Sequence, residues 1–282
     1  MEQAAVILFW ISFAGFVAAS VLFAYQMLLR RPVKIPPQMV TGIVLIIYTM
    51  SIGLNSVANG GTPMTGANQL VLASWALFVL FFIVEYVLKF KQYGGVLVPV
   101  GVVFMAIAML VSKGSKDIAP ISSNISQQMD SMGIAFHVGL IVFANMLFLI
   151  GAIASALYLY QAKQLKAHST SLLSRRLPSL ANLERLASRS ITIALPIYLG
   201  GQLLGIIRAI RVDAAGWWAD PRVMLSGAVF VVFAIYMILM LRNKISGQAN
   251  AWIAIFGGVL VVSLMVIARV LPVGFHVFGV IG

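Results

Sequence analysis

Eight long apolar runs dominate the sequence, each of about the length that crosses a bilayer. They cover residues 4–29, 37–58, 69–90, 94–112, 134–162, 189–211, 223–242 and 251–272. A helix needs roughly 20 residues to span an apolar layer about 30 Å thick. Runs this continuous exclude the alternation of apolar and polar residues on which a membrane β-barrel depends. The sequence therefore predicts an all-α fold, a polytopic transmembrane helical bundle of about eight spans.

The composition agrees with an integral membrane protein. Hydrophobic residues make up 61% of the chain and charged residues only 9%, against roughly 25% charged in soluble domains. A net charge of +12 would suggest nucleic acid in a soluble domain, but here the basic residues lie in short gaps between apolar runs and form no aromatic-rich face. We expect a lipid bilayer around the chain and no nucleic-acid partner. The chain has no cysteine, which excludes disulfides and thiolate chemistry by its own residues.

The distribution of basic residues predicts how the chain is oriented. Thirteen of the 19 fall in the gaps after the first, third, fifth and seventh runs, and six fall on the other side. By the positive-inside rule, both termini and the gap between runs six and seven then lie on the outer side. The first run lacks the basic start and cleavage site of a signal peptide and is expected to be retained. The longest cytoplasmic gap, about 163–188, includes the amphipathic stretch "LANLERLASRS", which we expect to rest on anionic headgroups. No internal repeat is visible.

Two histidines are predicted at the outer surface. His137 opens the fifth run and His276 follows the eighth, whereas His168 lies in the basic cytoplasmic gap. Neutral imidazole is a ready metal ligand, so two imidazoles at one membrane depth are candidate ligands. The alternative is that each is an interfacial residue hydrogen-bonded to a neighbour or to water.

The outer gap "RVDAAGWWADPRVML", residues 211–225, has two adjacent tryptophans. Trp217 and Trp218 can form an aromatic surface for a ligand, or they can belong to the tryptophan belt found at membrane interfaces. Asp220, directly before Pro221, is predicted to cap the start of the seventh helix. Arg222 follows in the same gap.

Charged residues within or beside the apolar runs are costly and usually have a partner. Arg208 and Arg269 lie near the outer ends of runs six and eight, where they can bind ligand carboxylates or reach lipid phosphates. Glu85 precedes Lys89 by four residues, and we expect an ion pair between them. Small residues for close helix packing are indicated at three positions in the sixth run, Gly200, Gly201 and Gly205.

Residues 182–241, together with "GFHVFG" around His276, resemble the cytochrome c assembly, or heme-handling, family of CcsA, CcmC and HemX-type membrane proteins. In that family an outer tryptophan-rich loop ending in an aspartate forms a shelf for heme, and an outer histidine on each side supplies an axial ligand. The resemblance implies that His137 and His276 bind heme iron. It places Trp217, Trp218, Asp220 and Arg222 on the loop, and Arg208, Arg222 or Arg269 are expected to hold the propionates.

The resemblance covers about residues 134–279, so we expect an N-terminal four-helix membrane segment, 1–130, and a heme-handling core, 131–282. It implies a b-type heme held transiently during cytochrome c maturation, within a cytochrome c synthase (heme lyase) system in which no catalytic residue is assigned to this chain. Implied partners are apocytochrome c and ResB/CcsB-like or ABC-type heme export components. The implied location is a bacterial inner membrane or a thylakoid-like membrane.

The chain departs from the family pattern in two ways. Asp213 and Ala214 stand where the loop usually begins with Trp-Gly, and Ala219 precedes the aspartate in place of another tryptophan. No histidine lies inside a predicted span, which argues against heme transport across the bilayer and favours a CcmC-like or HemX-like role. The rival hypotheses are a HemX-type regulatory or scaffolding protein of heme biosynthesis without heme transfer, and a transporter, for which inverted repeats and broken helices are missing.

Overall fold

The computed structural model describes residues 1–29, 34–59, 66–91, 93–112, 125–168, 176–211, 216–242 and 247–270. Within these residues, eight helices are long and apolar enough to cross a membrane, in agreement with the predicted polytopic helical bundle. The chain divides into two compact units, Met1–Ser122 and Ser123–Gly282, called unit 1 and unit 2.

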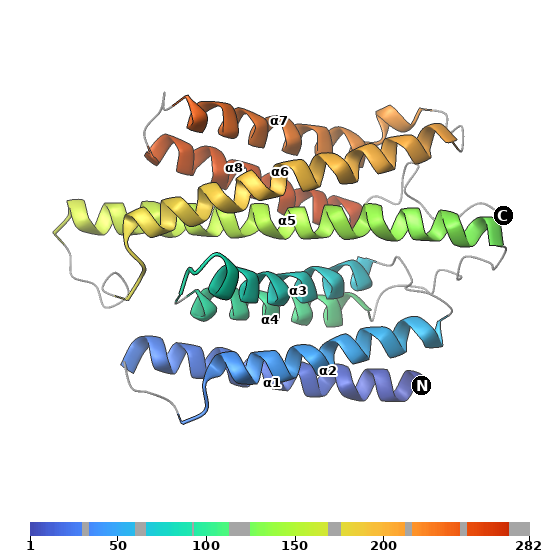
Figure 1. Ribbon diagram of the computed structural model, residues 1–282, viewed down its shortest axis with the longest axis horizontal. Coiled ribbons are helices and arrows are strands. Elements are labelled where there is room, and N and C mark those ends of the chain that lie inside the picture. The colour runs from blue at the N-terminus through green and yellow to red at the C-terminus, as the bar shows by residue number, and fades with distance from the viewer. Residues whose placement is uncertain are drawn as a thin grey trace. The chain divides into compact units, whose positions relative to one another are not determined.

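Each unit contains four of these helices (Figure 1). Unit 1 holds α1 (Glu2–Leu29), α2 (Pro37–Ala58), α3 (Gly66–Phe82), which continues as the π-helix η1 (Ile83–Val87), and α4 (Gly94–Ser112). Unit 2 holds α5 (Ile125–Lys166), α6 (Leu180–Arg211), the short 3-10 helix η2 (Trp217–Ala219), α7 (Pro221–Leu241) and α8 (Gly247–Val270).

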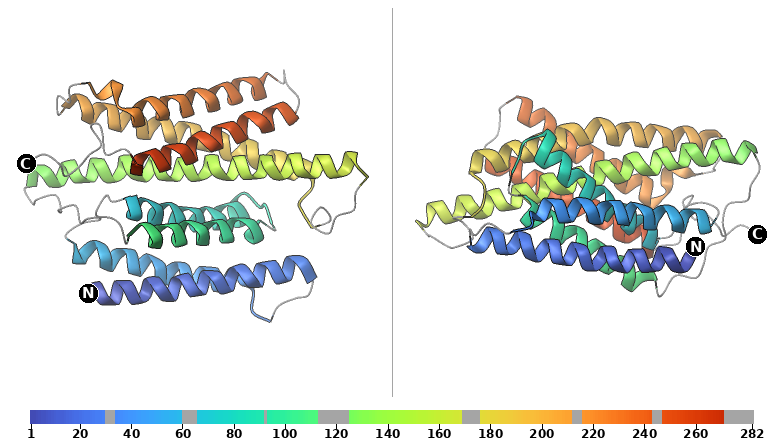
Figure 2. Two further views of the ribbon diagram at one scale, coloured as in Figure 1. Left: turned by 180° about the vertical axis from the view of Figure 1, so that it is seen from behind. Right: turned by 60° about the horizontal axis from the view of Figure 1, so that its bottom comes forward.

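Two helices of unit 2 are much longer than the sequence indicated. α5 has 42 residues and α6 has 32, because the stretch "LANLERLASRS" forms the first turns of α6. Its apolar positions Leu183, Leu186 and Ala187 are buried within unit 2. An apolar stripe at helical spacing is stabilised when a neighbouring helix covers it, and α5 packs along α6 here (Figure 2). The apolar face of this stretch therefore packs on protein and not on the membrane, and contact of its basic residues with anionic headgroups stays a prediction.

The core of unit 1 is centred on three aromatic rings. The rings of Phe16 on α1 and Phe78 on α3 stack with their centroids 3.6 Å apart, and Tyr48 on α2 meets the Phe16 ring edge-on. The Tyr48 hydroxyl and the Ser74 hydroxyl share a hydrogen bond of 2.8 Å, so the polar end of the buried tyrosine is satisfied.

The core of unit 2 has the same plan. The rings of Phe148 on α5 and Phe233 on α7 stack at 3.8 Å, and the Tyr198 ring on α6 packs edge-on against Phe148. The Tyr198 hydroxyl donates to the Ser226 carbonyl on α7 over 3.3 Å. Again a tyrosine on the second helix of the unit is bonded to the third helix.

The two units therefore repeat one four-helix arrangement in the same chain order. In each, the first helix packs on the second and fourth, and the third packs on the fourth. A glycine on the fourth helix also faces the stacked phenylalanine of the third, as Gly101 faces Phe78 and Gly257 faces Phe233. The repeat is not visible in the sequence because core packing depends on the size and spacing of side chains and tolerates many substitutions.

A buried acid in unit 1 has a different partner from the one predicted. Glu85 is only 9% exposed, and its carboxylate accepts a hydrogen bond of 2.9 Å from the Gln38 amide on α2. The predicted ion pair with Lys89 is wrong, because η1 ends at Val87 and Lys89 has a left-handed backbone with φ 57. The spacing of four residues therefore no longer corresponds to one helical turn.

Candidate functional site

His137 on α5 is held against the backbone of α6. Its Nδ1 lies 2.7 Å from the Gly201 carbonyl oxygen, and its ring is partly buried. A carbonyl oxygen only accepts, so Nδ1 carries the proton and donates. The neutral ring then has its basic lone pair on Nε2, the nitrogen that can act as a metal ligand. Histidine ligands of metals usually donate their second N–H to a carbonyl or carboxylate in this way.

Two glycines make this contact possible. A Cβ atom at Gly205 would lie 2.7 Å from the Cε1 atom of His137, and one at Gly201 would lie 2.8 Å from the Ile141 side chain. Both positions must therefore lack a side chain for α5 and α6 to approach this closely. The prediction of a close-packing role is confirmed for these two, whereas a Cβ at Gly200 would have only Leu140 nearby, at 3.9 Å.

The tryptophan-containing segment between α6 and α7 has a defined backbone. Gly216 has a left-handed φ of 71, a conformation that favours glycine, and η2 follows it directly. Asp220 then accepts a hydrogen bond of 2.8 Å from the Arg222 backbone N–H, with Pro221 at the first helical position. The predicted helix cap is confirmed. Because Asp220 is only 3% exposed, it fixes the start of α7 and presents little surface to a ligand.

The two tryptophans differ in exposure. Trp218 is 69% exposed, and Trp217 is partly buried. Among the residues that the structure describes, neither indole stacks on another aromatic ring. Two indole rings are thus held on one short helix, with Trp218 largely exposed, which suits a planar apolar ligand as well as an interfacial belt.

Two of the three candidate arginines lie at the same end of unit 2. Arg208 is three residues beyond Gly205 on α6, Arg222 is in the first turn of α7, and both are partly buried. Arg269 lies within α8, with its side chain outside the described part, and His276 lies outside the described residues.

Hydrogen bonds between α6 and α7 hold this end of unit 2 together. The Gln202 amide donates to the Ser226 carbonyl over 3.0 Å, beside the bond from Tyr198 to the same oxygen. Consequently the start of α5, the end of α6 and the start of α7 gather at one end, the Trp-loop end (Figure 1). The structure places six candidate residues there, His137, Arg208, Trp217, Trp218, Asp220 and Arg222. His168, after the other end of α5, is exposed.

Comparisons with known proteins agree with one family. A family profile described as "Cytochrome C assembly protein" matches residues 64–276. "Protein HemX" of Brevibacillus brevis is 29% identical over 224 residues, which cover 78% of this chain and 80% of that protein. "Cytochrome c biogenesis protein CcsA" of Guillardia theta is 22% identical over 256 residues, covering 85% of this chain and 84% of that protein. The family match begins well before residue 134, so the likeness is wider than the sequence motifs indicated.

Proposed function

Because this chain belongs to the cytochrome c assembly protein family, we propose that it is a membrane heme-handling protein in cytochrome c maturation. In this proposal heme is the cargo, held at the outer membrane surface between two histidines and over the tryptophans of the Trp-loop end. The similarity to proteins named HemX and cytochrome c biogenesis protein CcsA supports a role in heme or cytochrome c biogenesis. The membrane is proposed to be a bacterial inner membrane or a thylakoid-like membrane.

The hydrogen bond from His137 to Gly201 is the observation that carries the proposal. It fixes the ring orientation and the tautomer, so that Nε2 is the basic nitrogen that an axial ligand of iron needs. The close contact between the His137 ring and Gly205 prevents the ring from turning without a change in helix packing. His276 is proposed as the second axial ligand.

The remaining side chains at the Trp-loop end suit the rest of the heme molecule. Trp217 and the exposed Trp218 offer indole faces to the porphyrin, and Arg208, Arg222 and Arg269 are proposed to neutralise the propionates. Asp220 contributes indirectly, since its cap on α7 positions both the indoles and Arg222.

Bound between two imidazoles, heme iron would be in a form suited to storage and delivery. The chain's own residues bind and orient, and we assign no bond-making step to them. Without cysteine, this chain cannot supply thiols for attachment, so these must come from the apocytochrome c partner. ResB/CcsB-like proteins or ABC-type heme export components are the further partners proposed.

A second candidate function is a HemX-type regulatory or scaffolding role in heme biosynthesis without heme transfer. The observation that favours it is the 29% identity to the protein named HemX. The two functions differ in what a deletion strain lacks. Loss of holocytochrome c with normal tetrapyrrole levels supports heme handling, whereas altered tetrapyrrole levels with normal cytochrome c support the regulatory role.

Absorption spectroscopy of the purified protein tests heme binding directly. We expect a Soret band after expression in heme-replete cells, and His137→Ala and His276→Ala should each lower it or shift its position. His168→Ala is the matched control, because His168 is exposed at the other end of α5 and should leave the spectrum unchanged. A wild-type protein without heme, or three variants with the same spectrum, would contradict the proposal.

A further inference from the structure

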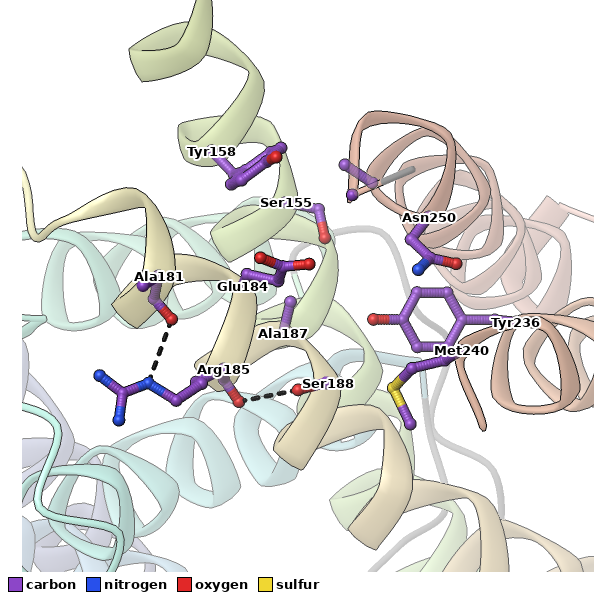
Figure 3. A pocket seen from close by; sticks show the side chains of 12 residues that line it. Ser155, Tyr158, Ala181, Glu184, Arg185, Ala187, Ser188, Tyr236, Met240 and Asn250 are labelled. Carbon is purple, nitrogen blue, oxygen red and sulfur yellow. Dashed lines mark hydrogen bonds between the residues drawn. The ribbon is translucent and has the colours of Figure 1, made fainter. Parts of the chain in front are cut away.

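A pocket of about 290 Å³ lies among all four long helices of unit 2, at the end opposite the Trp-loop end (Figure 3). This basic-end pocket lies where α5 and α7 end and α6 and α8 begin. Its polar lining residues are Ser155 and Tyr158 on α5, Glu184, Arg185 and Ser188 on α6, Tyr236 on α7 and Asn250 on α8.

Several of these polar groups are buried without a protein partner. Ser155 is 2% exposed and Tyr236 is 3% exposed. Within the described residues, neither side-chain hydroxyl makes a hydrogen bond, and the Asn250 Oδ1 is buried and unpaired as well. The great majority of buried polar groups are hydrogen-bonded. A cavity lined by two unpaired hydroxyls is therefore suited to a polar ligand or to ordered water, whereas the Asn250 Oδ1 is itself almost inaccessible.

Unit 1 shows how the same place in the fold can be filled. Counted from the paired core rings, Ser155 follows Phe148 by seven positions, as Phe23 follows Phe16. Similarly, Asn250 precedes Gly257 by seven, as Gly94 precedes Gly101. In unit 1 the Phe23 ring packs directly on Gly94, where a Cβ would lie 2.4 Å from the ring.

Where unit 1 has the Phe23 ring on Gly94, unit 2 therefore has the Ser155 hydroxyl and the Asn250 amide. On α6 a further replacement adds space, since Ser188 precedes Tyr198 by ten positions and Gln38 precedes Tyr48 by ten. The pocket thus distinguishes unit 2 from unit 1. It has smaller or polar side chains at the positions where unit 1 is filled by its own residues.

The acidic side chain at the pocket favours a positively charged ligand. Figure 3 shows the Glu184 carboxylate and the Tyr236 hydroxyl on the side of the pocket, whereas the Arg185 guanidinium extends away from it. Arg185 is bound to its own helix, with Nε donating to the Ala181 carbonyl over 3.2 Å and a second nitrogen donating to Asn182. Glu184, an exposed residue at the edge of the cavity, is therefore the one of the two charged residues whose charged group lies on the side of the pocket.

The hydroxyl groups of the pocket can accept hydrogen bonds as well, since their oxygens have lone pairs. Among the described residues, no group of three or more His, Asp or Glu side chains could hold a metal ion. A small organic cation with several N–H donors matches both the size and the acceptors.

We propose that the basic-end pocket binds a primary ammonium group through Glu184, Tyr236 and Ser155. Such a group is offered by the ethanolamine headgroup of a phospholipid and by soluble amines. Lys163 and Lys166 are exposed at the same end of α5, where they favour a ligand that also has a phosphate. The site is remote from His137, so it stands independently of the heme proposal.

Lipid competition on the full-length purified protein tests the lipid source. Phosphatidylethanolamine and phosphatidylcholine with the same acyl chains are offered together, and bound lipid is counted by native mass spectrometry. The choline headgroup has the same charge but no N–H donors, so we expect the wild type to retain phosphatidylethanolamine about tenfold more, as loss of charge-assisted hydrogen bonds implies. Ethanolamine and choline, added to lipid-free protein in a thermal unfolding assay, test the soluble source by the same comparison.

Two variants separate binding from folding. Glu184→Gln removes the charge, and Ser188→Gln keeps the charge but fills the cavity in the manner of Gln38. Both are expected to abolish the preference for the ammonium ligand, while Glu2→Gln, an exposed acid on α1, retains it. A preference seen only with ethanolamine supports a soluble ligand. Equal retention of both lipids together with equal effects of both amines would overturn the proposal and leave a water-filled cavity.

Discussion

At the scale of single residues, the Trp-loop end depends on positions where a side chain is absent. Gly205 leaves room for the His137 ring, and Gly201 gives α5 access to a carbonyl oxygen. The sequence indicated both histidine and glycines, but as unrelated features on different helices. Only the pairing of α5 with α6 shows that they form one arrangement, because residues 64 positions apart in sequence leave no local signal of contact.

Gly205→Ala is expected to displace the His137 ring, since the new methyl group would lie 2.7 Å from it. Heme absorbance per mole of protein should fall several-fold, while the helical content stays close to that of the wild type. Gly200→Ala is the control, because it places the same methyl group on the same helix with its nearest neighbour at 3.9 Å. Equal heme content in the two variants would contradict this account of Gly205.

Asp220→Ala is expected to lower the free energy of unfolding by about 1 kcal/mol, as loss of a helix cap usually does. The side chain accepts from the Arg222 backbone N–H, so Asp220→Asn, which keeps an acceptor oxygen, should retain most of the stability. Thermal unfolding in detergent measures both. A loss in Asp220→Asn equal to that in Asp220→Ala would indicate that the charge matters more than the cap.

At the scale of helices, the sequence correctly predicted that eight long helices exist and the order in which they occur, but it predicted their lengths less well. Six of the eight runs agree with their helices to within a few residues, because a bilayer imposes the length of an apolar span. α6 is longer because its polar N-terminal extension packs on protein through Leu183, Leu186 and Ala187, and α5 also continues beyond its apolar run at both ends. Such extensions have no apolar run to mark them, as in "LANLERLASRS", where only every third or fourth residue is apolar. The partner of Glu85 was predicted wrongly for a related reason, because the sequence contains no signal for a π-helix.

Gln38→Leu is expected to destabilise unit 1 by about 1–3 kcal/mol, because it leaves the buried Glu85 carboxylate without its donor. Adding Glu85→Leu should restore much of the lost stability, because two apolar side chains can pack against each other and no unpaired carboxylate stays buried. The measurement is thermal unfolding of the single and double variants. Gln26→Leu, on an exposed position of α1, is the control, and a double variant no more stable than Gln38→Leu would contradict the pairing.

At the scale of the whole molecule, the chain is two versions of one four-helix arrangement. Unit 1 fills both ends with its own side chains, since the Ser51 hydroxyl donates to the Ala5 carbonyl over 2.7 Å and Gln38 bonds Glu85. By the same count along the helices, Ala5 and Ser51 correspond to His137 and Gly201. The unit with the candidate sites thus differs from its counterpart at the positions where those sites occur.

The predicted orientation can be measured because the chain has no cysteine, so a single introduced thiol has no background. Ala219→Cys in η2 and Ala167→Cys after α5 both occupy exposed positions. A membrane-impermeant maleimide is expected to label Ala219→Cys on intact cells and Ala167→Cys only after permeabilisation. The reverse pattern would place the Trp-loop end inside and remove the basis for heme handling at the outer surface.

The length of α5 links its tip to the thickness of the membrane. With 42 residues, at about 1.5 Å per residue, the helix is roughly 60 Å long, twice the depth of the hydrocarbon layer. Helices accommodate changes in bilayer thickness largely by tilting, and a change in tilt of about 10° would swing the far end of such a rod by roughly 10 Å. His137 lies in the first third of α5 and is hydrogen-bonded to α6. A change in tilt that moved these two helices together would therefore alter how far the imidazole stands from the lipid surface.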